Sequence, residues 1–216
     1  MKVIIIDYGL SNLLSVKRAV EHCGFEAEIS YDPEVIKNAE CLILPGVGAF
    51  SKGMEQLRSL GLDDLIREHV DAGKPFLGIC LGMQMMFSSS EEGGIHAGLG
   101  IIPGTVEKIP DIAADGTHLR VPHVSWQKVS FERCPDHYLF TGIESGSEFY
   151  FVHSYEGKPL DTEMLLACCV YGGKEVTAIV SNKEGNAIGC QFHPEKSGHA
   201  GLALLNNFLS SAAHED

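Results

Sequence analysis

Short apolar runs alternate with segments of helical periodicity over residues 1–90. The runs suit strands that are buried on both faces of a sheet. Helical spacing follows Ser11, a candidate N-cap, and returns over residues 51–72 and 83–87. This alternation predicts a parallel sheet with helices on both faces. The strands are predicted at residues 3–7, 27–30, 41–44 and 76–79.

The pattern changes after residue 92, where short strand-like runs are separated by polar or Gly- and Pro-containing breaks. This spacing predicts a β-rich, partly antiparallel second half. Ser197 is then predicted to cap a last amphipathic helix, whose apolar face carries Leu202, Leu205, Phe208, Leu209 and Ala212. No linker or repeat divides the chain, so we expect a single domain over residues 1–216. The strand-like runs span residues 121–129, 149–154, 165–171, 176–181 and 187–192.

The composition is that of a globular protein, with 44% hydrophobic and 21% charged residues among 216. A net charge of −13 disfavours nucleic acid and anionic membranes as partners, because like charges repel. The seven cysteines cannot all pair within the chain, which favours a reducing compartment. The apolar run at residues 3–6 is too short for a signal peptide or a membrane span. We therefore expect a cytoplasmic protein.

Residues 78–82 read Gly-Ile-Cys-Leu-Gly, between a predicted strand and a predicted helix. A nucleophile elbow has this context, because the tight turn requires small residues near the nucleophile. The following helix would favour a Cys80 thiolate, and the Leu81 N–H would point at a developing oxyanion. On this motif alone, an unreactive cysteine in a glycine-containing turn is an equally good interpretation.

Residues 191–195 read Gln-Phe-His-Pro-Glu. Residues i and i+2 of a strand project to the same side, so His193 and Glu195 are expected to be neighbours at a strand end. A cysteine nucleophile needs a base, and the base needs an orienting group. Alone, this motif is better explained as a solvated turn. Together with Cys80 it predicts a Cys-His-Glu triad.

Residues 45–50 read Pro-Gly-Val-Gly-Ala-Phe and follow the third predicted strand. Two glycines there let backbone amides approach a ligand, so the loop could supply a second oxyanion donor. A phosphate-binding loop competes, but no Gly-Lys-Ser/Thr follows, which excludes the Walker type. His118 and His123 lack further ligands at zinc-like spacing, so we expect no metal and no cofactor.

The motifs at residues 78–84 and 191–195 together resemble those of the class I, or triad-type, glutamine amidotransferases. Within that class the chain resembles the glutaminase subunits of imidazole glycerol phosphate synthase, which serve histidine biosynthesis. The resemblance extends from end to end. It implies a flavodoxin-like, mostly parallel central sheet with flanking helices, joined to a β-rich C-terminal half. The segments that carry it further are residues 6–13, 45–50, 121–123, 150–155 and 193–197.

The resemblance also implies roles for individual residues. Cys80 attacks the glutamine side-chain amide and forms a thioester, His193 moves the protons, and Glu195 orients His193. Backbone N–H groups of the oxyanion hole are assigned to Leu81, Val47 and Gly48. That loop is implied to be misoriented until a partner binds its own substrate. Positions that match the family's glutamine-binding residues are Gly46, Gln84, Glu92, Ser154 and Tyr155.

The resemblance implies a heterodimer with a (β/α)₈-barrel cyclase, through which ammonia passes to a phosphoribosyl-formimino intermediate. One departure concerns this partner. The family usually reads Pro-His-Met-Gly-Trp-Asn where residues 122–127 read Pro-His-Val-Ser-Trp-Gln. The residues that match the family's docking or gating face are His123, Trp126, Gln127, Tyr150 and Lys196.

Three alternatives remain at this point. The altered segment at residues 122–127 motivates a paralogous glutaminase that feeds ammonia to a different synthase, such as a surface-sugar amidotransferase. A non-catalytic regulatory subunit with the same fold is disfavoured by the intact Cys80, His193 and Glu195. A cysteine protease or hydrolase would cleave peptides or esters without any preference for free glutamine.

Overall fold

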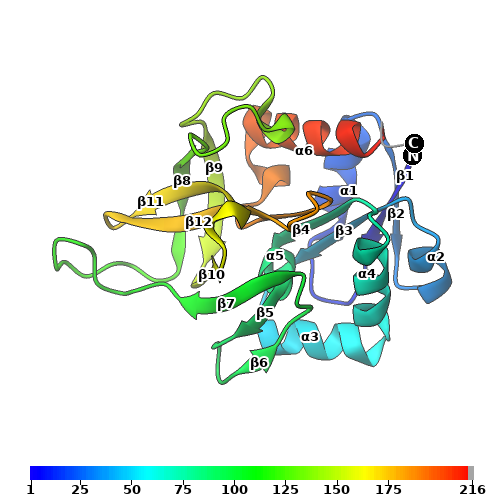
Figure 1. Ribbon diagram of the computed structural model, residues 1–216, viewed down its shortest axis with the longest axis horizontal. Helices are drawn as coiled ribbons and strands as arrows, with labels where there is room; N and C mark the ends of the chain where they lie inside the picture. The colour runs from blue at the N-terminus through cyan, green and yellow to red at the C-terminus, as the bar shows by residue number, and fades with distance from the viewer. Residues whose placement is uncertain (214–216) are drawn as a thin grey trace.

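A computed structural model describes residues 1–213. It contains two β-sheets, and helices cover both faces of the larger one (Figure 1). In chain order the elements are β1 (Lys2–Ile6), α1 (Leu13–His22), β2 (Glu26–Ser30), α2 (Pro33–Lys37), β3 (Cys41–Gly46), α3 (Phe50–Ser59), α4 (Leu62–Asp71), β4 (Phe76–Cys80), α5 (Leu81–Met85), β5 (Phe87–Ser90), β6 (His96–Ala97), β7 (Ile102–Lys108), β8 (His123–Ser130), η1 (Tyr138–Phe140), β9 (Glu148–His153), β10 (Tyr155–Pro159), η2 (Thr162–Met164), β11 (Leu165–Tyr171), β12 (Lys174–Ser181), β13 (Ala187–Cys190), η3 (Pro194–Lys196) and α6 (Gly198–Ala212).

The larger sheet is parallel in one half and antiparallel in the other. Its nine strands follow the order β2-β1-β3-β4-β13-β12-β11-β8-β9. The pairs from β2 to β13 are parallel, and those from β13 to β9 are antiparallel. The predicted mixture of a parallel first half and a partly antiparallel second half is therefore confirmed. Strand β13 brings the end of the chain back beside β4, which places the two sequence motifs at the same sheet edge.

Alternating side chains of the parallel strands enter two separate cores. In β1, Val3 and Ile5 pack with residues of α1 and α6, whereas Ile4 and Ile6 pack with residues of α3, α4 and α5. All four are nearly or fully buried. Figure 1 shows α1 and α6 on one side of the sheet and α3, α4 and α5 on the other. Burial on both faces explains why these strands appear as continuous apolar runs in the sequence.

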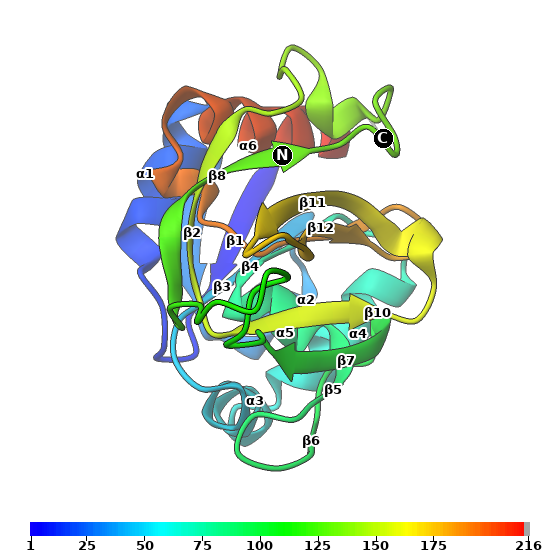
Figure 2. The same cartoon turned by 90° about the vertical axis from the view of Figure 1, so that its left-hand side faces the viewer.

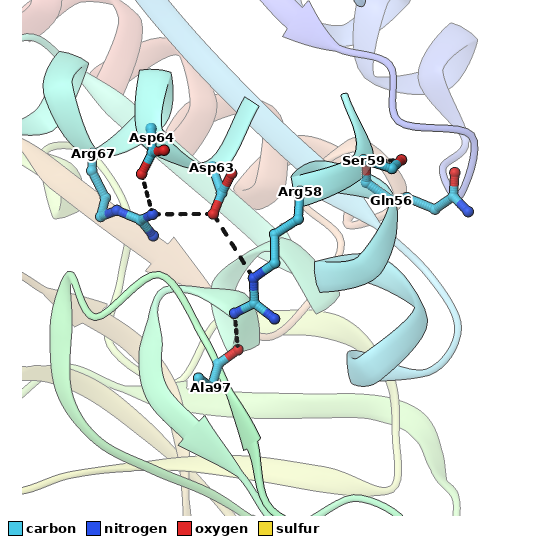
Figure 3. A network of polar contacts seen from close by, with 7 residues as sticks. All are labelled: Gln56, Arg58, Ser59, Asp63, Asp64, Arg67 and Ala97. Carbon is cyan, nitrogen blue, oxygen red and sulfur yellow. Dashed lines mark hydrogen bonds and ion pairs between the residues drawn. The ribbon is translucent and has the colours of Figure 1, made fainter. Parts of the chain in front are cut away.

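A second sheet of four strands, in the order β10-β7-β5-β6, was not expected from the sequence. It lies below β11 and β12 in both views (Figures 1 and 2). Polar contacts of Arg58 join it to the helices (Figure 3). The guanidinium donates to the carbonyl of Ala97 at 2.7 Å and lies 3.8 Å from Asp63, which also pairs with Arg67 at 3.1 Å. Such half-exposed pairs each contribute about 0–1 kcal/mol, so they orient the sheet more than they stabilise it.

Some local predictions need correction. Helix α1 begins at Leu13 with Asn12 at the N-cap position, and Ser11 does not cap it. Ser197 occupies the N-cap position of α6, but its side chain does not cap the helix, because its hydroxyl donates to the His193 carbonyl at 2.7 Å. The helix predicted at residues 83–87 is α5, which begins at Leu81 and ends at Met85, and Phe87 already belongs to β5. Helix α2, whose Asp32 side chain accepts from the Glu34 N–H, was missed because it is only about one turn long. Within residues 1–213, no helix has the length and apolar character needed to cross a membrane.

Candidate active site

Cys80 is the last residue of β4 and the N-cap of α5. Its φ of 55° makes it the one non-glycine residue with positive φ in the part of the chain that the structure describes. Such a sparsely populated conformation costs roughly 1–3 kcal/mol, and Cys80 is only 6% exposed at this turn. The turn also depends on Gly82, because a Cβ there would lie 1.7 Å from the carbonyl oxygen of Leu44. The predicted strand–elbow–helix arrangement is present.

His193 and Glu195 lie beyond the end of β13, on the same sheet edge as Cys80. The His193 Nδ1 and Glu195 Oε1 atoms are 2.9 Å apart, and the two side chains are 4% and 1% exposed. The local structure differs from the predicted strand end, because Glu195 belongs to the short 3₁₀ helix η3. The contact is nevertheless the one that an orienting carboxylate makes with a catalytic imidazole.

The proton of His193 is controlled by two opposing effects. Burial alone would lower its pKa, but interactions with Cys80 and then with Glu195 overcome it and raise the pKa to about 9. The Nε2 atom makes no hydrogen bond of ordinary geometry within residues 1–213, so Cys80 acts on it across a longer contact. Loose contacts of this kind are common before substrate binds. The imidazolium form is therefore favoured beside the sulfur.

A cavity of about 260 Å³ opens over Cys80. Four of the five residues predicted to hold substrate line it, namely Gln84, Glu92, Ser154 and Tyr155. Gly46 does not, because it packs against the buried Tyr8 hydroxyl, which a Cβ at Gly46 would approach to 2.1 Å. The full lining consists of Val47, Gly48, Cys80, Leu81, Gln84, Glu92, Pro122, Val152, His153, Ser154 and Tyr155.

The two predicted sources of oxyanion donors differ in availability. The Leu81 N–H is the first amide of α5, where no carbonyl of the helix can accept it. The Val47 N–H instead donates to the carbonyl of Leu10 at 2.9 Å, so it does not face the cavity. Glu92 lines the cavity, and its Oε2 also accepts a hydrogen bond from the Phe50 N–H at 2.7 Å.

A chain of hydrogen bonds that the sequence did not reveal leads from the cavity to strand β8. Burial lowers the pKa of His153 to about 3 and that of His123 to about 4, so both rings are neutral near pH 7. His153 Nδ1 donates to the Tyr155 carbonyl at 2.8 Å, because a carbonyl only accepts. His153 Nε2 then accepts from His123 Nδ1 at 2.9 Å, and His123 Nε2 accepts from Ser125 at 2.8 Å. Gln127 donates to Ser125 at 3.2 Å.

The residues predicted to contact a partner fall into two groups. Trp126 is 50% exposed, its ring centre lies 6.0 Å from that of the half-buried Tyr150, and Lys196 is exposed. His123 is fully buried and stacks on Tyr171 inside the protein, so it cannot lie on the exposed face. Strand alternation explains the difference, because Trp126 and His123 project from opposite faces of β8.

Comparisons with known proteins identify the family of the chain. The family model for class-I glutamine amidotransferases matches residues 4–212. The chain is 48% identical to the imidazole glycerol phosphate synthase subunit HisH of Methanosarcina acetivorans, over 96% of this chain and 98% of that protein. It is 48% identical to the HisH subunit of Geobacillus sp. (strain WCH70), over 95% of each chain. A chain in the solved structure of PurLQS from Thermotoga maritima shares the fold, with a TM-score of 0.70, 21% identity and coverage of 97% and 98%.

The resemblance that the motifs indicated is thus confirmed over nearly the whole chain. The matched region contains the Cys80 elbow and the His193–Glu195 pair together. Relatives at 44–48% identity from Syntrophotalea, Geobacillus and Methanosarcina species carry one name. The chain belongs to the class-I glutamine amidotransferase family and, within it, to the HisH subunits of imidazole glycerol phosphate synthase.

Proposed function

We propose that this chain hydrolyses glutamine to glutamate and ammonia through Cys80, His193 and Glu195, and that the ammonia is used by a synthase partner. The observation that carries the proposal is the meeting of these residues at one sheet edge. Cys80 stands in an elbow with positive φ and lines a cavity, and the buried His193–Glu195 pair acts on it. The name shared by the HisH relatives supports imidazole glycerol phosphate synthase as the assembly.

The chemistry follows from the proton on His193. The Cys80 sulfur attacks the amide carbon of glutamine, and a C–S bond forms. The resulting oxyanion is stabilised by the Leu81 N–H. The imidazolium of His193 then protonates the leaving nitrogen as the C–N bond breaks, which releases ammonia and leaves a thioester. Water attacks the thioester while His193 takes its proton, the C–S bond breaks, and glutamate leaves as the Cys80 thiolate and the His193 imidazolium are restored.

The hydrogen bond from Val47 to Leu10 supports control by a partner. While the Val47 N–H donates to Leu10, this amide is withheld from the oxyanion hole, and removing a single such donor costs about 10²–10³ in rate. Rotation of the peptide would supply the second donor. We propose that a (β/α)₈-barrel cyclase stabilises the rotated loop and receives the ammonia. Coupling prevents hydrolysis of glutamine when no acceptor is present. Direct transfer to the partner is needed because free ammonia becomes protonated in water and ceases to be a nucleophile.

Glutamate release tests both parts of the proposal. The chain is assayed alone, with a cognate barrel cyclase, and with the cyclase plus its nucleotide ligand. We expect a low rate alone and a rise of at least about 10²-fold with the liganded cyclase. Cys80→Ser should remove activity in every condition, whereas Cys23→Ser, at a half-buried thiol away from the site, should retain it.

Two results would redirect the assignment. If Cys80 reacts with a glutamine-like affinity reagent but the cyclase has no effect, the glutaminase stands and another synthase is the partner. Residues 122–127 are the segment to examine then, because they depart from the family pattern. Unchanged turnover in Cys80→Ser would remove the catalytic assignment itself.

A further inference from the structure

Gln191 is fully buried and contacts the reacting sulfur. Its Nε2 lies 3.7 Å from Cys80 Sγ, within hydrogen-bonding distance for sulfur. The residue is the first of the Gln-Phe-His-Pro-Glu motif, and the triad mechanism gives it no task. A fully buried amide in this position requires an explanation, because burying polar groups is unfavourable unless they are hydrogen-bonded.

The orientation of the Gln191 amide follows from its neighbours. The carbonyl of Tyr155 can only accept, so the Gln84 atom 2.9 Å from it is the nitrogen. The same nitrogen lies 3.0 Å from one end of the Gln191 amide, and both N–H bonds of Gln84 are then used. The Gln191 atom facing Gln84 must therefore be its oxygen. The amide nitrogen of Gln191 is left facing the sulfur of Cys80.

This donor is placed where it acts on negative charge. The Val152 carbonyl also lies 3.8 Å from the sulfur, but it can only accept, so it opposes a thiolate. An N–H donor stabilises the thiolate and directs its lone pairs, and in a buried site such an interaction is stronger than in water. The Tyr155 carbonyl, which accepts from the Gln84 amide, also accepts from His153. These two hydrogen bonds fix the position of the Gln84 amide that contacts Gln191.

We propose that Gln191 stabilises the Cys80 thiolate and sets its orientation for attack, and that Gln84 positions Gln191 through its amide. The role in turnover rests on the proposed glutaminase function. The contact with the sulfur does not, so reactivity of the thiol can be measured without glutamine. Gln84 acts through Gln191 and is a positioning residue, in addition to lining the cavity.

The test combines thiol reactivity with kinetics in the full chain. Carbamidomethylation of the Cys80 peptide by iodoacetamide at pH 7 is followed by mass spectrometry, and glutamine turnover is measured with the partner present. Gln191→Met keeps the length of the side chain but removes its donor. We expect alkylation and kcat to fall together by about 10- to 100-fold, as for a lost hydrogen bond to a charged group, with KM within about twofold.

Further variants separate this role from packing. Gln84→Met should lower the rates of alkylation and turnover by a smaller factor, because Gln191 keeps its N–H donor but loses the hydrogen bond from Gln84 that orients it. Gln191→Asn keeps a polar amide, so it serves as a second variant if the methionine variant does not fold. Its shorter side chain cannot reach both Gln84 and Cys80, so the rates of alkylation and turnover should both fall. Gln56→Met, the same exchange at a half-buried helix position on α3, should change neither. Thermal unfolding of each variant reports on folding.

The outcomes are distinct. Unchanged alkylation with a raised KM would show that Gln191 only shapes the glutamine pocket, and unchanged alkylation and kcat would reduce it to packing. Either result overturns the proposal. If wild type releases no glutamate but alkylation still depends on Gln191, the glutaminase function fails while the contact with the thiolate stands.

Discussion

At the scale of single residues, His193 is where burial and charge compete. Burial disfavours an imidazolium, yet Cys80 and Glu195 together outweigh it. Two other buried cysteines, Cys41 and Cys169, lie near acidic groups instead. Burial raises the pKa of each to about 12, so these thiols stay protonated and unreactive near pH 7. The nucleophile is thus distinguished by its surroundings and not by its residue type.

The titration of His193 tests this account. Its imidazole signals in NMR spectra should report a pKa of about 9 in the wild type. In Cys80→Ala the pKa should fall, because the first of the two stabilising partners is gone while burial remains. In Glu195→Gln it should also fall. A His193 pKa that is the same in wild type and Cys80→Ala would contradict the inferred contact between the two side chains.

At the scale of elements, the turn between β4 and α5 determines where the nucleophile stands. The turn brings α5 so close to β3 that Gly82 touches the Leu44 carbonyl. The two faces of strand β8 have different surroundings. Ser125 continues the buried histidine chain on one face, while Trp126 is exposed on the other.

Gly82→Ala should disrupt the elbow. A Cβ 1.7 Å from backbone cannot be accommodated by a side-chain rotation, so α5 must move away from β3. We expect the free energy of unfolding to fall by about 3 kcal/mol or more, and glutaminase activity to be lost with it. Urea denaturation measures the first effect. Gly116→Ala provides the comparison, since a Cβ there meets nothing within 4 Å, although its φ of 85° still strains an alanine. Equal losses in the two variants would contradict a steric cause.

The two faces of β8 should respond differently to substitution. Ser125→Ala removes the donor to His123 and should lower the free energy of unfolding by about 1–2 kcal/mol. Trp126→Ala should leave stability nearly unchanged but weaken binding of the partner, since aromatic residues dominate interface energies. Denaturation and titration calorimetry with the cyclase measure these effects. If Trp126→Ala lowered stability without affecting partner binding, and Ser125→Ala weakened binding without affecting stability, the predicted interface would be wrong.

At the scale of the whole molecule, buried histidines shape the dependence of stability on pH. Burial lowers the pKa of His69 and His123 to about 4 and that of His153 to about 3. A depressed histidine pKa means that the folded state binds fewer protons than the unfolded state. The stability it contributes is present above about pH 6.5 and is lost as pH falls below that value. His193 acts in the opposite direction, since its raised pKa gives stability that is present below about 6.5 and lost as pH rises through about 9.

The free energy of unfolding should therefore be greatest near pH 6.5–7 and decline on both sides. On the acid side, His153 alone contributes a slope of up to about 1.4 kcal/mol per pH unit while it stays neutral in the folded protein. Denaturant titrations between pH 5 and 9.5 measure the curve. His153→Gln should flatten the acid limb, and His193→Gln should flatten the alkaline limb. A curve that keeps both limbs in both variants would contradict the assignment.

Patterns in the sequence were sufficient to predict the alternation of strands and helices in the first half, the elbow at Cys80 and the partnership of His193 with Glu195. These depend on local rules, namely apolar runs, glycine spacing and side-chain alternation, which act over a few residues. The family and its sheet also followed, because their motifs are short and specific. The second sheet, β10-β7-β5-β6, was not predicted, because its strands are as short as two residues and are held by pairing with segments distant in the sequence.

Only the tertiary structure revealed the occupied Val47 amide, the buried His123 and the contact between Gln191 and Cys80. Each depends on atoms far apart in sequence that meet because β1 pairs with β3, β13 pairs with β4 and β8 pairs with β9. The sequence by itself determined which residues can perform the chemistry, since that is a property of residue type and local spacing. The tertiary structure decided which donors face the sulfur and which side chains face outward, because hydrogen-bond partners and burial are set by packing between distant segments.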